Sequence, residues 1–489
     1  MLGYILLGFA IYYYFYAGMK KWSILIFMFF CNNGFQILPD FVIGAKNYDL
    51  AAIFCFFMAP FSMIYEDAPE RENKTIKYLV VFMMYFMIVS AFFSRYHYDF
   101  TWFQIFQGGR RLIIFVSYFF IVKMKKKDIE WLFNILFKIT MITSVLYIIQ
   151  VVTDLPVLPH LKGDKIAELG AELGTYGRYY NSPPLLYLFL FISIFHPELL
   201  KIKRPYISVM IFAAALLCTL GRVQITSVIF MTIIGFLMRG RLTVFVKYAL
   251  VFSLALIPLS DSISMRFSGE DYGSNSATEE IKNIMNGSVQ ETVLTGDIKG
   301  KGTMNYRLAW IFERMLYLSE RPIGEKIFGL GMISDSQIET VQRMYNFRVG
   351  REQTEDSNAI GQLSTPDTSY GNLLSKFGYV GGTVFFILWV TIMIYGWKNR
   401  KKDEWMFILF LITADMIILS FSGDVISNPK YLSILYLIIT LSLFRQTEKQ
   451  EDNPILAESE SNLDSLPDNS TSSSENIANT TATDENHSH

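Results

Sequence analysis

Three short stretches of this 489-residue chain place an arginine directly after a glycine, next to apolar sequence. They are FQGGRRL (106–112), YGRYYNSPP (176–184) and TLGRV (219–223). Glycine lets a backbone turn sharply or approach a ligand closely, and a planar guanidinium can donate paired hydrogen bonds to phosphate oxygens. The repeated pairing therefore indicates an anion site suited to a ligand that carries phosphate.

Arg222 is the most informative of these arginines, because it is the only charged residue between Tyr206 and Met238. A charged side chain in the middle of a membrane helix is unfavourable by about 3 kcal/mol or more. We therefore predict that the chain breaks here into two short helices. In this interpretation Gly221 allows the turn, and Arg222 lies at the outer mouth of the second helix.

A second interpretation of the arginines stays open. Their long side chains can reach lipid headgroups, or they can pair with Asp99, Glu168 or Asp424. The arginines expected at the outer face, which need either such a carboxylate partner or an anionic ligand, are Arg95, Arg110, Arg111, Arg178, Arg222 and Arg307. Those expected to bind phosphate or pyrophosphate are Arg110, Arg111, Arg178, Arg222 and Arg307.

Two acidic residues could take part in chemistry. Asp367 precedes a long apolar stretch in STPDTSYG (364–371), and a carboxylate at such an interface can act as a general base. The same position also suits an ordinary helix N-cap. Asp415 lies inside the apolar stretch LITADMIIL (411–419), where it is either functional or a neutral, hydrogen-bonded packing residue.

Other reaction types have no support in the sequence. There is no D-x-D, H-E-x-x-H, G-x-S-x-G or P-loop pattern, and His97, His160 and His196 are scattered. The three cysteines, at 31, 55 and 218, lie in apolar stretches without metal-binding or disulfide spacing. We therefore expect metal-independent chemistry with no cofactor and no nucleic-acid partner.

The residues around these sites indicate a polytopic membrane protein. Hydrophobic residues make up 52% of the chain and charged residues only 18%, a composition that a soluble fold cannot bury. We expect an all-α fold with about 12–13 transmembrane helices, the first of them a retained anchor rather than a signal peptide. The thirteen candidate spans are 2–18, 22–38, 49–65, 76–94, 108–123, 130–152, 182–198, 206–220, 222–238, 243–259, 373–396, 404–421 and 428–444.

The positions of lysine and arginine orient these spans. With thirteen spans, all seven basic clusters lie on one side, which the positive-inside rule identifies as the cytoplasm. The N-terminus is then outside and the C-terminus inside. The domains expected from this topology are a helical bundle over 1–259, a large external loop with short helices over 260–370, further spans over 371–445 and a disordered acidic tail over 446–489. Within the loop, residues 304–320 have the spacing of an amphipathic helix.

Three motifs in one order resemble the bacterial O-antigen ligase/polymerase superfamily. They are LGRVQITSVIF (220–230) at a helix break, YRLAWIFERMLYLSERPIGEKIFGLGM (306–332) in the loop, and DTSYGNLLSKFGYVGG (367–382) entering a span. The stretch GRYYNSPPLLYLF (177–189) also resembles the family's earlier Gly-Arg-Asn-Pro segment. The resemblance covers about 175 to 385 and implies a GT-C type membrane glycosyltransferase. Its donor would be an oligosaccharide linked to undecaprenyl diphosphate at the outer leaflet of the inner membrane.

The resemblance also implies roles for individual residues. Arg222 and Arg307 would bind the donor pyrophosphate and stabilise its charge as it leaves, with Arg178 as a third ligand. Ligases of the family usually have a histidine where this chain has Asp367, so the departure favours a polymerase and leaves the base assignment open. The aromatic residues expected to stack on sugars, or simply to lie at the membrane interface, are Tyr176, Tyr179, Tyr180, Trp310 and Tyr370.

The expected function is polymerisation of lipid-linked repeat units of O-antigen, capsule or exopolysaccharide in the bacterial cytoplasmic membrane. The partners implied by the resemblance are the lipid-linked oligosaccharide, the bilayer, a chain-length regulator and a flippase. One alternative is a ligase that transfers finished glycan to a lipid A core or to protein. A non-enzymatic flippase is the other, although the absence of a repeat and the asymmetric loop count against it.

Overall fold

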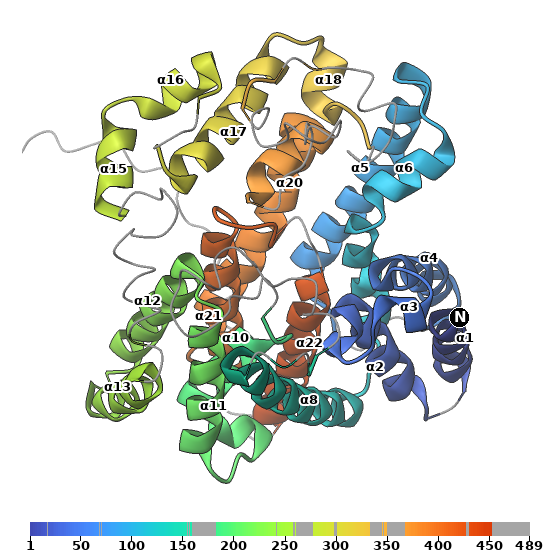
Figure 1. Ribbon diagram of the computed structural model, residues 1–489. Coiled ribbons are helices and arrows are strands. Elements are labelled where there is room, and N and C mark those ends of the chain that lie inside the picture. Colours follow the sequence, from blue (N-terminus) through green and yellow to red (C-terminus); the bar gives the residue numbers. More distant parts are fainter. Residues whose placement is uncertain are drawn as a thin grey trace, which may run out of the picture. The chain divides into compact units, whose positions relative to one another are not determined.

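The computed structural model describes residues 1–16, 18–67, 69, 71–153, 155, 157–158, 182–240, 242–257, 260, 277–297, 301–332, 345, 347–349, 367–426 and 430–451. Every regular element in these ranges is a helix, as predicted (Figure 1). The chain divides into a unit over Met1–Phe444 and a second unit over Arg445–His489.

Each of the thirteen predicted spans overlaps at least one described helix. The helices of the first half are α1 (Leu2–Phe15), α2 (Lys20–Cys31), η1 (Asn33–Gln36), α3 (Asp40–Ile43), α4 (Asn47–Tyr65), α5 (Lys74–His97), α6 (Trp102–Gly109), η2 (Leu112–Ser117), α7 (Tyr118–Ile121) and α8 (Lys126–Thr153). Next come α10 (Leu186–Phe195), η4 (Pro197–Leu200), α11 (Pro205–Cys218), α12 (Arg222–Arg239) and α13 (Leu242–Leu256). The last long helices are α20 (Ser369–Asn399), α21 (Glu404–Leu419) and α22 (Lys430–Glu451).

Five of the described helices are long and apolar enough to cross a membrane: α4, α5, α8, α12 and α20. The shorter apolar helices, which include α1, α10 and α11, have 10–17 residues. A bilayer core of about 30 Å calls for roughly 20 helical residues, and a helix of 14 residues spans only about 21 Å. The described part is thus an all-α protein with membrane-spanning helices, and the number and direction of its spans stay predictions.

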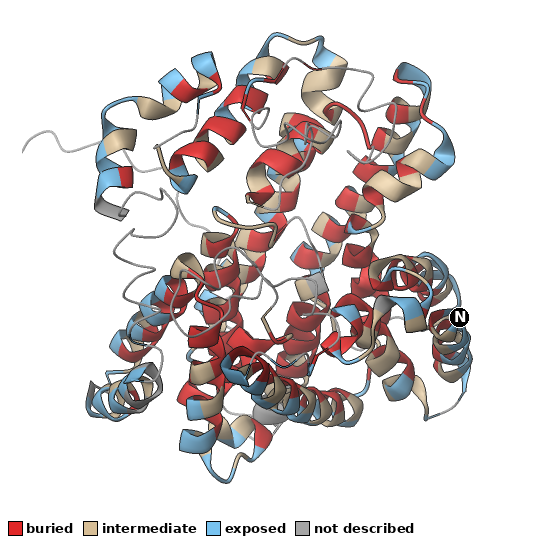
Figure 2. Ribbon diagram, in the orientation of Figure 1, coloured by how far each residue is buried: buried red, intermediate tan, exposed pale blue. Residues whose placement is uncertain are grey.

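Helix α5 shows why a bilayer is the natural surrounding of this bundle. Its serines Ser90 and Ser94 are fully buried, whereas Tyr78, Phe82 and Tyr85 are 66%, 46% and 66% exposed. In water this pattern would be inverted, since large apolar side chains gain from burial. Figure 2 shows the buried residues of the bundle on the inward faces of its helices.

One predicted span is not a single helix. The expected helix over 108–123 is divided into the end of α6, the 3-10 segment η2 and the short α7. Gly108 and Gly109 weaken an α-helix here, and the β-branched Ile113, Ile114 and Val116 follow a few residues later. A 3-10 helix is narrower than an α-helix, so this segment fills less space between its neighbours.

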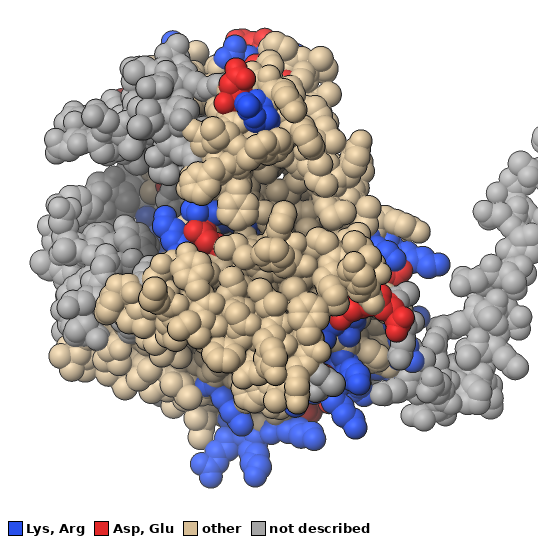
Figure 3. Space-filling view, turned by 90° about the vertical axis from the view of Figure 1, so that its right-hand side faces the viewer, with Lys and Arg blue, Asp and Glu red and all other residues tan. Residues whose placement is uncertain are grey.

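Two of the predicted basic clusters meet at one end of the helices. Lys20 donates from Nζ to the Glu66 carboxylate at 2.8 Å, and Lys123 donates from Nζ to the Glu66 carbonyl at 3.0 Å. Figure 3 shows basic side chains gathered along the lower edge of a broad, largely uncharged surface. Such a one-sided distribution of lysine and arginine is typical of membrane proteins.

The helices of the long loop are α15 (Ala277–Met285), α16 (Ser288–Thr295), α17 (Thr303–Ser319) and α18 (Ile323–Phe328). Figure 1 shows them together at one end of α20, against which α17 and α18 pack. The amphipathic helix predicted over 304–320 is confirmed as α17. Its buried residues Tyr306, Trp310, Glu313 and Arg314 recur at helical spacing on the inward face.

Candidate functional site

The N-terminus of α20 is tied to the turn that follows α21. Ser369 donates from its backbone nitrogen to the Ser420 carbonyl at 3.0 Å and from Oγ to the Gly423 carbonyl at 2.9 Å. The Tyr370 hydroxyl donates to the Ile417 carbonyl at 3.0 Å. These bonds hold the start of α20 in place and so restrict where Asp367, two residues before it, can lie.

Asp367 is not the N-cap of α20, although its sequence position suits one. Thr368 occupies the N-cap position in extended conformation and makes no side-chain capping bond. The Asp367 side chain is 40% exposed and lies 3.8 Å from the Arg307 guanidinium, measured from Oδ1 to Nη2. The capping interpretation of Asp367 is therefore wrong, and its carboxylate faces the loop arginine instead.

Helix α17 brings Arg307 to this place, and its packing on α20 depends on a glycine. A Cβ atom at Gly371 would lie 2.5 Å from Cδ1 of Trp310, so any larger residue would push α17 away from α20. Arg307 lies three residues, nearly one helical turn, before Trp310, and its side chain is only 15% exposed. Two residues 60 positions apart in the sequence thus become neighbours through one helix contact.

The Trp310 ring has a different environment from the one expected. Its side chain is 1% exposed, and the Arg314 guanidinium carbon lies 3.4 Å from the ring centroid. The ring is therefore covered by protein and offers no open face for a sugar. Tyr370 is partly buried, with its ring centroid 4.5 Å from that of Phe421.

Arg314 and Glu313 form the polar centre of the loop, which the sequence analysis did not identify. Arg314 Nη1 lies 2.6 Å from Glu313 Oε2, and the backbone nitrogen of Val349 donates to the same carboxylate at 3.2 Å. Burial raises the pKa of Glu313 above its ordinary value, while Arg314 and the backbone donors act in the opposite direction. The only sequence signal was a charged pair on the apolar face of an amphipathic helix.

Arg222 begins α12, as the predicted helix break requires, but the turn is made differently. α11 ends at Cys218, and the left-handed residue in the connection is Leu220, with φ of 47°, whereas Gly221 has φ of −87°. A Cβ atom at Gly221 would meet only the end of the flexible Gln224 side chain, which can move away, so space does not strictly require a glycine here. The expectation that Gly221 makes the turn was wrong, although the break itself is confirmed.

The surroundings of Arg222 favour an anion. It is the first helical residue of α12, where backbone N–H groups and the helix dipole add positive potential. No carboxylate within the described ranges lies at ion-pair distance from its guanidinium. Unlike Arg110 and Arg111, it therefore has no acidic partner in this part of the chain.

Helices α12 and α21 pack antiparallel, which gives the position of Arg222 along the bundle. The Arg239 guanidinium, at the end of α12, lies 5.2 Å from the Phe407 ring centroid, near the start of α21. Further along both helices, the buried Asp415 of α21 lies near Ser227 of α12, although neither of its carboxylate oxygens has a hydrogen-bond partner in the described part of the chain. The two helices are therefore in register at Ser227 and Asp415.

From that contact, equal steps along both helices lead to the same end of the bundle. Arg222 lies five residues before Ser227, about 7.5 Å along the helix axis, and Ser420 lies five residues after Asp415. Ser420 accepts the hydrogen bond from Ser369 at the start of α20. Arg222 consequently lies at the end of the bundle where α20 begins and where Arg307 meets Asp367.

Arg110 and Arg111 belong to a charged cluster at this same end. Arg110 Nη1 lies 2.8 Å from Asp49 Oδ2, and Arg111 Nη1 lies 3.5 Å from Asp424 Oδ2. Both guanidinium groups lie over the Tyr48 ring, at 4.9 and 4.8 Å from its centroid. The alternative of carboxylate pairing is thus confirmed for these two arginines, and Asp424 was correctly anticipated as a partner.

Some of the expected site residues lie outside the described residues. Arg178 and the tyrosines 176, 179 and 180 fall in the undescribed range 159–181. Within the described ranges, no group of three histidine, cysteine or acidic residues could hold a metal ion. The cysteines Cys31, Cys55 and Cys218 are buried, and none of them forms a disulfide within the described residues.

Comparison of the chain with family models, curated proteins and solved structures finds no match. The resemblance to the O-antigen ligase/polymerase superfamily therefore rests on the motifs alone, and the function they imply is a hypothesis.

Proposed function

We propose that this protein is a membrane glycosyltransferase that polymerises oligosaccharide repeat units carried on undecaprenyl diphosphate. The observation that carries the proposal is the 3.8 Å approach of Arg307 to Asp367, at the bundle end where α12 presents Arg222. A cation and a carboxylate beside an apolar bundle suit a reaction that expels a diphosphate and removes a proton.

In the proposed reaction, a hydroxyl oxygen of the acceptor repeat unit attacks the anomeric carbon of the donor sugar. The bond from that carbon to the diphosphate oxygen breaks, and undecaprenyl diphosphate leaves with the electron pair. Arg222 and Arg307 donate hydrogen bonds to the diphosphate as its charge develops. Asp367 accepts the hydroxyl proton or, in the weaker form of the hypothesis, only orients the acceptor.

The experiment is to express Arg222→Ala, Arg307→Ala and Asp367→Asn in a strain that makes the glycan and to resolve surface glycan by size. Losing one charge-assisted hydrogen bond to the diphosphate removes about 1.5–3 kcal/mol, which slows polymerisation roughly 10- to 100-fold. Single repeat units should then dominate the surface acceptor. The matched control is Arg95→Ala. Arg95 lies in the last turn of α5, and its guanidinium pairs only loosely, at 3.9 Å, with the Asp99 carboxylate.

The same experiment separates the alternatives. A ligase would leave surface acceptors without glycan while lipid-linked chains of normal length accumulate, and a flippase would leave lipid-linked units unprocessed inside the cell. Unchanged glycan length in all three variants, with normal amounts of protein in the membrane, would contradict the site assignment. Asp367→Glu distinguishes a residue that accepts the hydroxyl proton from one that only orients the acceptor. The variant keeps a carboxylate base but displaces it by one methylene group.

A further inference from the structure

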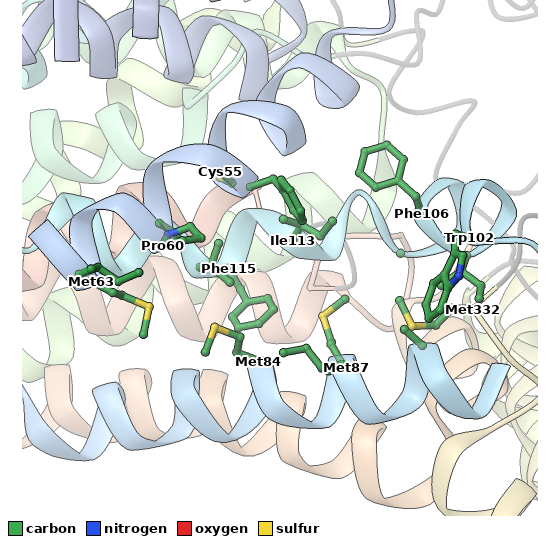
Figure 4. Close-up of a pocket in the computed structure, with 18 residues that line it drawn as sticks. Cys55, Pro60, Met63, Met84, Met87, Trp102, Phe106, Ile113, Phe115 and Met332 are labelled. Carbon is green, nitrogen blue, oxygen red and sulfur yellow. The ribbon is translucent and has the colours of Figure 1, made fainter. Parts of the chain in front are cut away.

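An apolar groove of about 530 Å³ opens between α4, α5 and the irregular segment η2 (Figure 4). Every residue that lines it is apolar, and methionines contribute at both ends, with Met63 and Met84 at one and Met332 at the other. Methionine side chains are flexible and polarisable, so they adapt to an irregular hydrocarbon surface. The lining thus suits a hydrocarbon chain and offers nothing to a sugar.

The groove extends over much of one membrane leaflet. On α5 it follows residues 84, 87, 88 and 91, which share one helical face and extend over about 10 Å, and Trp102 continues it beyond that helix. Half of a typical hydrocarbon core is about 15 Å. Ile88 on α5 and Phe56 on α4 are 50% and 63% exposed, so the groove is open sideways to lipid.

The irregular structure of η2 explains why space is left here. A 3-10 segment is narrower than the α-helix predicted for this span, and Gly109 at its entrance carries no side chain. A Cβ atom at Gly109 would lie 2.2 Å from the end of the Met332 side chain. A larger residue at 109 would therefore displace Met332 and narrow the groove.

Charged residues lie near both ends of the groove, but Lys123, beyond Met63 and Ile64, already donates to the Ser62 and Glu66 carbonyls. At the other end Gly109 lines the groove, and Arg110 and Arg111 follow directly in the sequence. Arg111 is 48% exposed, and its nearest carboxylate oxygen, on Asp424, is 3.5 Å away. Its guanidinium thus keeps donors that can reach a second anion at the membrane interface.

We propose that this groove binds one acyl chain of an anionic membrane phospholipid whose phosphate lies at Arg111. A methylene group fills about the volume of a water molecule, about 30 Å³, so the groove holds roughly 18 of them. A single acyl chain of ordinary length matches this volume, the single-leaflet extent and the position of the arginine. The site is independent of the proposed glycosyltransferase reaction.

Native mass spectrometry of the full-length protein tests this site. The protein is delipidated in detergent and titrated with phosphatidylglycerol, and separately with a polyprenyl phosphate. Ala91→Trp fills the groove from α5, and Ile88→Trp fills it from a more exposed position in case the first variant fails to fold. Val246→Trp is the matched control, because Val246 is 65% exposed on α13 and far from the groove lining.

Wild type and Val246→Trp should each bind one phosphatidylglycerol tightly, and both groove variants should lose that bound lipid. Arg111→Gln should keep the site but weaken phosphatidylglycerol binding roughly tenfold, as the loss of one charge-assisted contact predicts. Equal binding by all variants would overturn the proposal. Preferential binding of the polyprenyl phosphate at the groove would overturn it as well, because the occupant would then be a different lipid.

Discussion

The contact between Gly329 and Gly378 gives the sharpest test of how the loop is attached to the membrane bundle. Gly378 interrupts α20 with φ of 65° and ψ of −169°, and Gly329 ends α18 with φ of 75° and ψ of −165°. The two backbones touch here, and Leu330 donates to the Ser375 carbonyl at 2.7 Å. Gly378→Ala should therefore loosen the attachment of α18 to α20.

Two effects of the alanine add together. This backbone region is nearly restricted to glycine, and occupying it with another residue is unfavourable by about 1–3 kcal/mol. The new Cβ atom would also lie 2.5 Å from the Lys326 carbonyl oxygen and 2.6 Å from the Gly329 nitrogen. Such overpacking adds about 1–3 kcal/mol. Together the two effects destabilise the closed junction by at least about 2 kcal/mol. The equilibrium constant for local opening of the junction then increases roughly 30-fold.

Hydrogen exchange measures this opening at the amide of Leu330, in peptides that cover 323–332. The matched control is Gly382→Ala on the same helix, where a Cβ atom would lie no closer than 3.6 Å to its nearest neighbour. That variant should exchange like the wild type or slightly more slowly, because alanine favours a helix. If Gly378→Ala is as well protected as Gly382→Ala, the reasoning from backbone contact is refuted.

Three further predictions concern buried charges. Arg314→Leu leaves the Glu313 carboxylate buried without its partner and should destabilise the loop helices by about 3–5 kcal/mol, seen as faster proteolysis between 277 and 332. Burial raises the pKa of Glu313 above 4.5, so the folded state holds this proton more tightly than the unfolded chain does. Stability should fall as pH rises from 4.5 towards the folded pKa, and thermal melts of Glu313→Gln should lack that slope. Both carboxylate oxygens of Asp415 are buried without a hydrogen-bond partner in the described part of the chain. Asp415→Leu removes this unsatisfied group and should melt at or above the wild-type temperature, whereas Asp415→Asn should melt like wild type; a clear loss of stability in Asp415→Leu alone would contradict this reasoning.

Much of the fold could be predicted because membrane helices are recognisable from the local hydrophobicity of the sequence. The apolar stretches that became α5 and α20 were identified from sequence, and the amphipathic spacing of α17 was sufficient to predict a helix in the loop. The helix break before Arg222 followed from the unfavourable free energy of one charge in hydrocarbon. In these cases the deciding interaction lies within a few residues along the chain.

Other features escaped prediction because they depend on residues that are distant in sequence. The local pattern suggested that Gly221 makes the turn, whereas the left-handed backbone conformation falls on Leu220. Asp367 looked like a helix cap, but the packing of α17 on α20 turns it towards Arg307. Nothing in the local sequence specifies such a contact.

The sequence by itself determined the class of this protein, the approximate course of its helices and the arginines that merit attention, since hydropathy and charge are local properties. Only the tertiary structure decided which arginines already have carboxylate partners. It paired Arg110 with Asp49 and Arg111 with Asp424, and it left Arg222 at the start of α12 without an acidic partner in the described ranges. The reason is physical: whether a guanidinium is available to a ligand depends on which side chains the packing of distant helices brings within a few ångströms.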